Sequence, residues 1–170
     1  MTWAAIILSF VTLQRLGELV LSGRNTERLL ERGAIEIGAG HYPMLVALHA
    51  AWLITLWVFG WDHQVYWPAL AAFAVLQGLR VWVLASLGSR WTTRIIVLPG
   101  APLVAAGPYR YVSHPNYAIV TAEIALLPLA LNLPLLALLF SVLNAIVLAI
   151  RIRTETRALA AFNAPLAGAP

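Results

Sequence analysis

Five long apolar segments run through the sequence and limit the folds open to it. They extend from about Trp3 to Leu21, Pro43 to Gly60, Trp67 to Leu87, Pro115 to Leu131 and Pro134 to Ile150. A transmembrane helix needs about 20 predominantly apolar residues. Because 61% of the residues are hydrophobic and only 11% are charged, a water-soluble globule could not cover its surface with polar groups. The sequence therefore predicts one all-α integral membrane domain, residues 1–170, with five transmembrane helices.

The arginines mark one side of the predicted membrane. All 11 basic residues are arginines, and nine of them lie in the segments 22–41 and 88–114 and in the tail after residue 150. The loops 61–66 and 132–133 have none. The positive-inside rule then places the N-terminus outside and the C-terminus in the cytoplasm, in a multi-pass protein of the inner (plasma) membrane. This excess records topology, so we expect membrane lipids around the chain and no nucleic-acid partner.

Several kinds of site are excluded or not expected. The chain has no cysteine, which excludes disulfides, thiolate metal ligands and a cysteine nucleophile. His41, His49 and His63 lack the spacing of metal ligands, so we expect structural roles for them and no metal site. Glycine-rich phosphate-binding motifs and the G-x-S-x-G motif are absent as well.

Charged and amide side chains lie inside the predicted spans, where each charge costs about 2.5–3.5 kcal/mol. Arg80 and Glu123 each lie eight residues from the cytoplasmic end of their segments, about 12 Å deep, and Asn144 lies about 10 Å deep. Arg15 and Glu18 share one helix face. Two interpretations remain open: buried ion pairs that hold the helices in register, or a polar pocket for a ligand head group. Convergence at one depth favours the pocket for Arg80, Glu123 and Asn144.

The segments outside the spans have patterns of their own. Residues 24–37 mix charges with leucine and isoleucine and predict a short interfacial helix broken near Gly33, with a solvated loop as the alternative. Residues 94–98 predict a short β-like run that ends at Pro99. The tail predicts a C-terminal helical extension into the cytoplasm. On the fifth helix and this extension, helical spacing places a polar stripe on one face: Ser141, Asn144, Arg151 and Glu155.

The long cytoplasmic loop ends in GPYRYVSHPNY, residues 107–117. Pro115 suits the first turn of a helix, whose backbone N–H groups are unpaired. His114 and the aromatic residues Tyr109, Tyr111 and Tyr117 gather at the same place. Turns, free amides, an imidazole and aromatic faces suit a polar, planar ligand such as an adenine nucleoside. The loop is therefore a predicted cofactor-binding loop.

Two elements of the sequence resemble the isoprenylcysteine carboxyl methyltransferase family and its phospholipid-methyltransferase relatives. GPYRYVSHPNY resembles the family's G-x-Y-x-x-x-R-H-P-x-Y signature, except that Ser113 stands where the family has arginine. RTET at 153–156 resembles the family's R-x-E-E element, with Thr156 in place of the second acid. The resemblance covers about residues 76–160. The matching residues are Gly107, Tyr109, His114, Pro115, Tyr117, Arg153 and Glu155.

The resemblance implies a membrane-embedded methyltransferase that uses S-adenosylmethionine and releases S-adenosylhomocysteine. Carried over, the seven matching residues become cofactor contacts, with Arg110 or Arg151 in place of the arginine missing at Ser113. LGSRWTTRIIVLPGAPLV, residues 87–104, is more similar to a small bacterial subgroup that methylates alkylpyrones and alkylresorcinols. The expected partner is thus a lipophilic small molecule that enters from the bilayer.

For the chemistry, we expect Glu123 to act as general base, because burial raises the basicity of a carboxylate. Arg80 would stabilise an enolate or phenolate, or a carboxylate if the substrate is an acid, with Asn144 in the same pocket. Methylation of a prenylcysteine carboxyl group or of a phospholipid amine is the alternative within the family. From other classes, an NADPH-dependent membrane reductase and a non-catalytic lipid-binding protein also remain.

Overall fold

Prolines mark the starts of most of the helices. In the computed structural model, which describes residues 2–102 and 104–163, Pro43 and Pro68 are the second residues of α2 (Tyr42–Gly60) and α3 (Trp67–Leu87). Pro115 and Pro134 open α4 (Pro115–Ala130) and α5 (Pro134–Asn163). A proline is tolerated there because the first N–H groups of a helix lack helical partners. At α1 (Trp3–Glu31), Thr2 Oγ1 caps the helix by accepting from Ala5 N at 3.1 Å. Met1 and residues 164–170 of the predicted domain lie outside the described residues.

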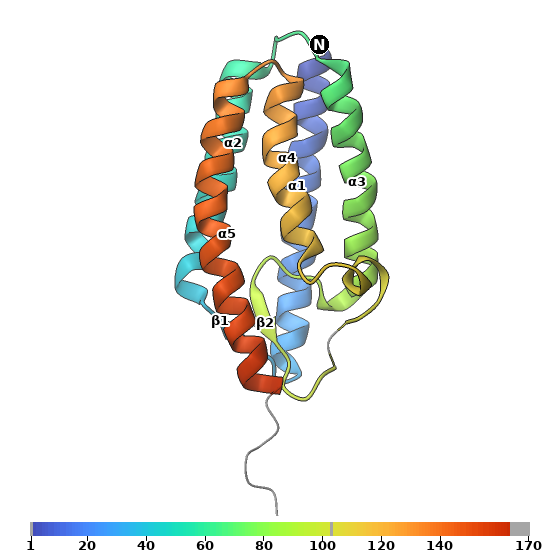
Figure 1. Cartoon of the computed structure of the whole chain (residues 1–170), viewed down its shortest axis with the longest axis vertical. Helices are drawn as coiled ribbons and strands as arrows, with labels where there is room; N and C mark the ends of the chain where they lie inside the picture. Colours follow the sequence, from blue (N-terminus) through green and yellow to red (C-terminus); the bar gives the residue numbers. More distant parts are fainter. Residues whose placement is uncertain (1, 103, 164–170) are drawn as a thin grey trace, which may run out of the picture.

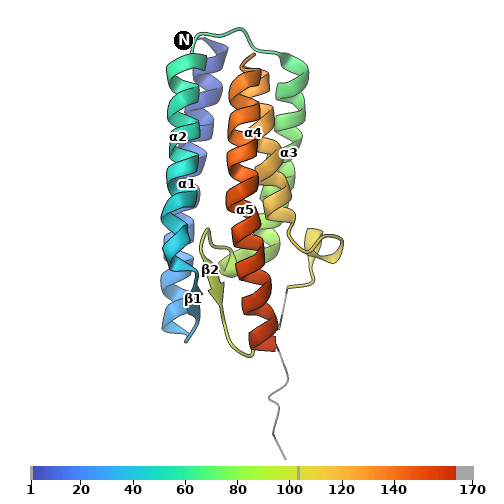
Figure 2. The same ribbon diagram turned by 60° about the vertical axis from the view of Figure 1, so that its left-hand side comes forward.

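The helices run alternately down and up in one bundle, so that α1 begins at the upper end and α5 finishes at the lower end (Figure 1). α4 lies between α3 and α5, against both of which it packs, and α1 packs against α2 (Figures 1 and 2). The lower end of α1, the loop between α3 and α4, and the end of α5 therefore meet at the lower end. These are the segments that hold nine of the arginines.

Among the described residues, four helices are long and apolar enough to cross a membrane: Trp3–Glu31, Ala39–Gly60, Trp67–Arg90 and Pro134–Ala160. The fifth predicted span, α4, is a shorter apolar helix of 16 residues. At a rise of about 1.5 Å per residue it is roughly 24 Å long, less than the hydrocarbon core of about 30 Å. It is short because the loop after α3 continues to His114 and because the chain turns at Leu131 after Pro128.

The short helix predicted over residues 24–37, broken near Gly33, is correct only in part, because residues 24–31 are helical but continue α1, and residues 35–37 form a strand. α1 continues unbroken to Glu31, and Gly33, with φ +84°, turns the chain into a strand. The reason is tertiary: Asn25 is buried and donates to Trp91 O at 2.8 Å, so this part of α1 is covered by the loop after α3. The charged residues that suggested an interfacial helix are exposed on the other faces of α1 and at its C-terminal end: Arg24, Glu27, Arg28, Glu31 and Arg32.

A two-stranded antiparallel sheet adds to the predicted all-α fold. β1 (Ile35–Ile37) pairs with β2 (Ile95–Val97), with Ile35 opposite Val97. β2 is the β-like run expected over residues 94–98. Three short 3-10 helices lie around the sheet and loops: η1 (Ala39–His41), η2 (Gly88–Arg90) and η3 (Gly107–Arg110).

The apolar core fills the upper half of the bundle. All five helices contribute to it, through buried residues that include Leu8, Trp52, Phe73, Leu127 and Phe140. The lower half is different, because the loops and the sheet close it from below and a large cavity remains inside.

Candidate active site

A cavity of about 980 Å³ occupies the lower half of the bundle. All five helices, β2, the loop around it and η3 contribute to its wall. Two polar groups lie at its ends. We call the lower one the loop–tail cluster: Tyr109, His114, Tyr117, Arg151 and Glu155. We call the upper one the membrane network: Gln14, Arg15, Glu18, Gln77, Arg80 and Glu123.

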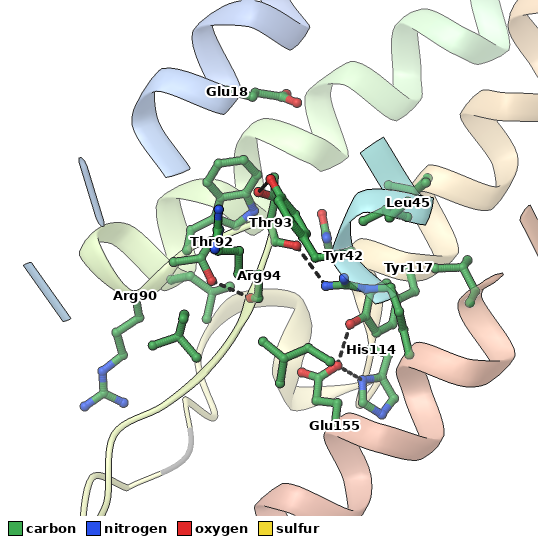
Figure 3. A pocket seen from close by; sticks show the side chains of 18 of the residues that line it. Glu18, Tyr42, Leu45, Arg90, Thr92, Thr93, Arg94, His114, Tyr117 and Glu155 are labelled. Carbon is green, nitrogen blue, oxygen red and sulfur yellow. Dashed lines mark hydrogen bonds and ion pairs between the residues drawn. The ribbon is translucent and has the colours of Figure 1, made fainter. Parts of the chain in front are cut away.

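The loop–tail cluster joins the first turn of α4 to the lower part of α5. Tyr117 Oη donates to Glu155 Oε2 at 2.6 Å, and His114 Nδ1 lies 3.7 Å from the same oxygen. The rings of His114 and Tyr117 are stacked, with centroids 5.5 Å apart and an interplanar angle of 27°. Figure 3 shows the three side chains converging on the cavity, with Glu18 of α1 well above them.

Arg151 and Asn116 bring polar atoms without partners to the same wall. Arg151 is 3% exposed and donates from Nη2 to Thr93 O at 2.8 Å, and its guanidinium lies 6.0 Å from the ring centroid of Tyr117. Within the described residues, Arg151 Nε and Asn116 Oδ1 are buried without a hydrogen-bond partner. A buried polar atom without a partner is costly, and this donor and this acceptor are free to bond a polar ligand in the cavity.

Tyr109 of η3 adds a phenol to this end of the cavity. Burial, together with the negative charge of Glu155, raises the pKa of Tyr109 to about 12. The phenol therefore keeps its proton at neutral pH and can donate a hydrogen bond.

Thr93 fixes the loop that forms the floor of the cavity. Its Oγ1 lies 2.8 Å from Ser22 Oγ on α1 and 3.0 Å from Tyr42 Oη on α2. Arg94 lies over the Tyr42 ring, 4.6 Å from its centroid, and pairs with Glu36 of β1 at 2.9 Å. Sequence reasoning missed Thr93, because a threonine in a loop gives no local signal of contacts to three helices.

The membrane network pairs two arginines with two carboxylates. Arg80 binds Glu18 through Nε at 2.5 Å and Nη2 at 2.6 Å, and binds Glu123 Oε2 through Nη1 at 2.8 Å. Arg15 donates to Glu18 Oε2 at 2.9 Å and to Glu123 Oε2 at 2.8 Å. Two positive and two negative groups leave this set formally neutral. The depth that the sequence predicted for Arg80 and Glu123 agrees with their direct contact.

Glu123 lies behind the arginines. Its Oε2 accepts from both of them and its Oε1 accepts from Gln77 Nε2 at 2.8 Å, while the residue is 1% exposed. Arg15, Glu18 and Arg80 are on the cavity wall, and Glu123 is not. Asn144 is also fully buried off the wall, with Nδ2 3.5 Å from Thr121 Oγ1. Of the three residues expected to form the acceptor pocket, only Arg80 faces the cavity.

Some of the predicted cofactor contacts line the cavity and others do not. Tyr109, His114, Tyr117 and Glu155 line the cavity, as does Ser113 at the position where the family has arginine. Arg151 lines the cavity too, whereas Arg110 is exposed and does not. The remaining three contacts are not on the wall: Gly107, Pro115 and Arg153.

These three residues have other surroundings. Gly107 has φ +56°, and a Cβ there would lie 2.1 Å from Ser86 Oγ, so the turn needs glycine. Pro115 is buried in the first turn of α4. Arg153 is exposed on α5, two residues from Glu155 and therefore on another face of the helix.

Comparison with known proteins shows the family of the chain. The family model described as "Isoprenylcysteine carboxyl methyltransferase (ICMT) family" matches residues 69–161, more than half of the chain and all of the loop–tail cluster. The chain belongs to the ICMT family. The ICMT match covers α3, α4 and most of α5, together with the loop that joins α3 to α4.

Two curated relatives are similar over nearly their whole length. The uncharacterized protein YpbQ of Bacillus subtilis is 36% identical over 163 residues, which are 93% of this chain and 97% of that protein. An uncharacterized protein of Haemophilus influenzae is 26% identical over 154 residues, 85% of this chain and 88% of that protein. No solved structure matches the chain. ICMT family membership indicates a membrane methyltransferase, and enzymes of this family in general use S-adenosylmethionine.

Proposed function

We propose that this ICMT-family protein is an S-adenosylmethionine-dependent O-methyltransferase whose acceptor is a long-chain alkylpyrone or alkylresorcinol. The observation that carries the proposal is the continuity of one cavity from the loop–tail cluster to the membrane network. A polar cofactor would bind at the lower end, and the ring of a lipophilic acceptor would reach it from the embedded end. Methyl transfer then depends largely on holding the two in line and away from water.

The side chains of the lower end fit the cofactor. S-adenosylmethionine carries a carboxylate, an ammonium group and an adenine amine, and when bound it supplies an electrophilic methyl group. Arg151 Nε offers an unpaired donor to the carboxylate, and Asn116 Oδ1 and Glu155 offer acceptors to the nitrogen groups. Tyr109 donates from a phenol that stays protonated. Arg151 would thus replace the family arginine that is missing at Ser113.

The neutrality of the membrane network favours a hydroxyl-bearing ring as acceptor. A prenylcysteine acceptor is equally consistent with the family, but its carboxylate would enter a site whose two arginines are already paired with Glu18 and Glu123. Arg80 remains well placed on the wall to stabilise the partial negative charge of a hydroxypyrone or phenol oxygen. In this proposal Glu123 positions the two arginines.

The acceptor's alkyl chain would lie among lipid-facing and cavity-facing leucines and valines. We propose that α4 is a short fifth span, with the N-terminus outside and the C-terminus in the cytoplasm of the plasma membrane. The arginine-bearing lower end would then be the cytoplasmic end, where a soluble cofactor has access. The membrane network would lie about one third of the way into the hydrocarbon core, counted from its cytoplasmic face.

The test supplies the purified protein with labelled S-adenosylmethionine and four acceptors in parallel: an alkylpyrone, an alkylresorcinol, a prenylcysteine and phosphatidylethanolamine. Methylation of either of the first two supports the proposal. Methylation of prenylcysteine or phosphatidylethanolamine alone would contradict the proposed acceptor but would support the proposed methyltransferase activity. Thermal protection by NADPH rather than S-adenosylmethionine would indicate a reductase, and protection by neither would indicate a lipid-binding protein.

A further inference from the structure

His49 of α2 lies on the cavity wall at the level of the membrane network. Ser22 and Tyr42 both bond Thr93 Oγ1 and therefore lie near one level. Arg15 precedes Ser22 by seven residues on the descending α1, and His49 follows Tyr42 by seven residues on the ascending α2. Both thus lie about 10 Å above Thr93 at 1.5 Å per residue. From sequence alone His49 was expected to have only a structural role, because nothing in its spacing relates it to Arg15.

The hydrogen bond of His49 fixes which ring nitrogen is available. Nδ1 lies 2.9 Å from Leu45 O, four residues earlier on the same helix. A carbonyl oxygen only accepts, so Nδ1 carries the proton and, in the neutral ring, Nε2 has the free lone pair. No group of the described residues donates to Nε2. His49 therefore presents an unused acceptor at the embedded end of the cavity.

The other side-chain acceptors on the wall at this end already have donors, although Arg15 Nε is a buried donor without a partner among the described residues. Glu18 accepts from Arg80, Arg15 and Gln14. Thr12 Oγ1 donates to Leu8 O at 2.7 Å and accepts from Trp57 Nε1 at 3.0 Å. The arginines have no acceptor atom.

The remaining carboxylate near this level, Glu123, is off the wall. It accepts from Arg15, Arg80 and Gln77. The carboxylates near His49 are thus paired with the arginines, and the imidazole Nε2 is the basic acceptor on this part of the wall that has no donor.

We propose that His49 Nε2 binds the hydroxyl of the acceptor and takes its proton during methyl transfer. The hydroxyl oxygen forms a bond to the methyl carbon, the bond from that carbon to the sulfonium sulfur breaks with its electron pair left on sulfur, and the proton ends on Nε2. The inference rests on the proposed O-methylation, and it makes His49, rather than Glu123, the general base.

The first test uses acceptors whose hydroxyls differ in acidity. A general base contributes about 10²–10⁴-fold, and it matters most for the weakly acidic phenol of an alkylresorcinol. We expect His49→Gln to lower turnover of the resorcinol about 100-fold or more and that of the acidic hydroxypyrone far less. If the wild type methylates only one of the two ring types, the comparison uses ring-substituted derivatives of that acceptor whose hydroxyl groups differ in acidity. The matched control is His63→Gln, whose Nδ1 likewise bonds a carbonyl, Leu131 O at 2.9 Å, but at the upper end of the bundle.

The second test measures binding without the cofactor, by quenching of tryptophan fluorescence. The wild type should bind an alkylresorcinol about fivefold more tightly than its dimethyl ether, as expected for one hydrogen bond. His49→Gln, which still accepts a hydrogen bond, should keep most of this preference. His49→Phe should lose it, and His63→Gln should retain it in full.

Particular results would overturn the inference. One is an equal loss of turnover on the weakly and strongly acidic acceptors in His49→Gln. Another is an equal affinity of the wild type for the resorcinol and its ether, or a preference that survives in His49→Phe. If the wild type methylates none of the acceptors, the proposed function fails, and the binding preference still decides whether His49 recognises a hydroxyl.

Discussion

Two residues of the tail, only two positions apart, illustrate how the helical face decides a role. Glu155 accepts from Tyr117 and lines the cavity, whereas Arg153 is exposed and off the wall. Both belong to the family's tail element in sequence. Because only Glu155 lines the cavity, variants at these two positions test which of the two residues contacts the cofactor.

Glu155→Ala should weaken binding of S-adenosylhomocysteine about tenfold or more, because hydrogen bonds to a charged group are worth about 1.5–3 kcal/mol. Arg153→Ala should bind it with nearly the wild-type affinity. Isothermal titration on both variants measures the difference. Equal losses in the two variants would mean that the cofactor contacts the outer face of α5.

Glu123 is the residue on which both arginines of the membrane network depend. Glu123→Gln keeps the shape but leaves two guanidinium groups with one buried carboxylate, and breaking a buried pair costs about 3–5 kcal/mol. We expect a clear fall in Tm in detergent. Glu36→Gln is the matched control, since its pair with Arg94 is partly exposed and worth about 1 kcal/mol or less. Similar Tm values for the two variants would contradict the central role of the network.

At the scale of elements, η3 controls where Tyr109 enters the cavity. Its first residue, Gly107, combines φ +56° with a close approach to Ser86 and Trp82 of α3. Gly33 also has a positive φ, +84°, but a side chain there would meet open space away from the cavity. Substitutions at the two glycines therefore distinguish the effect of a steric clash from the effect of backbone strain.

Gly107→Ala should weaken cofactor binding and lower stability, because the new methyl group must displace Ser86 or move the turn that carries Tyr109. Gly33→Ala should cost only the backbone strain, about 1–3 kcal/mol, and leave affinity unchanged, because Gly33 is not on the cavity wall. Titration and thermal unfolding of the two variants make the comparison. Wild-type affinity in Gly107→Ala would show that η3 does not position the site.

At the scale of the whole molecule, the apolar core and the cavity share the bundle between them. The core fills the upper half, and the cavity lies below it, closed by the sheet, the loops and the lower part of α5. The chain ends of the described bundle lie at opposite ends (Figure 1). This arrangement is consistent with an odd number of membrane crossings.

Fusions at the C-terminus test that topology. A fluorescent protein placed there should be bright and an alkaline phosphatase there should be inactive, because the arginine-rich end is expected in the cytoplasm. At the N-terminus a short accessible tag should be labelled from outside the cell. Labelling of both termini from the same side would mean that α4 does not cross the membrane.

The sequence by itself determined the class of the protein and most of its elements. The lengths of the apolar segments predicted the helices. Prolines, and the turns at Gly107 and Gly33, marked where elements begin and end. The elements at 107–117 and 153–156 identified the family, because all these signals are local in the chain. Depth counted along each helix also predicted the layer in which Arg80 and Glu123 meet.

Only the tertiary structure decided which polar groups face the cavity. The rotation of each helix about its axis decides which of its residues face the cavity. It separates Glu155 from Arg153, places Glu123 behind Arg80, and places His49 on the cavity wall. The pairing of β1 with β2 and the contacts of Thr93 join segments more than 50 residues apart. The physical reason is that helix rotation and loop closure are set by packing between distant segments, which a linear pattern does not record.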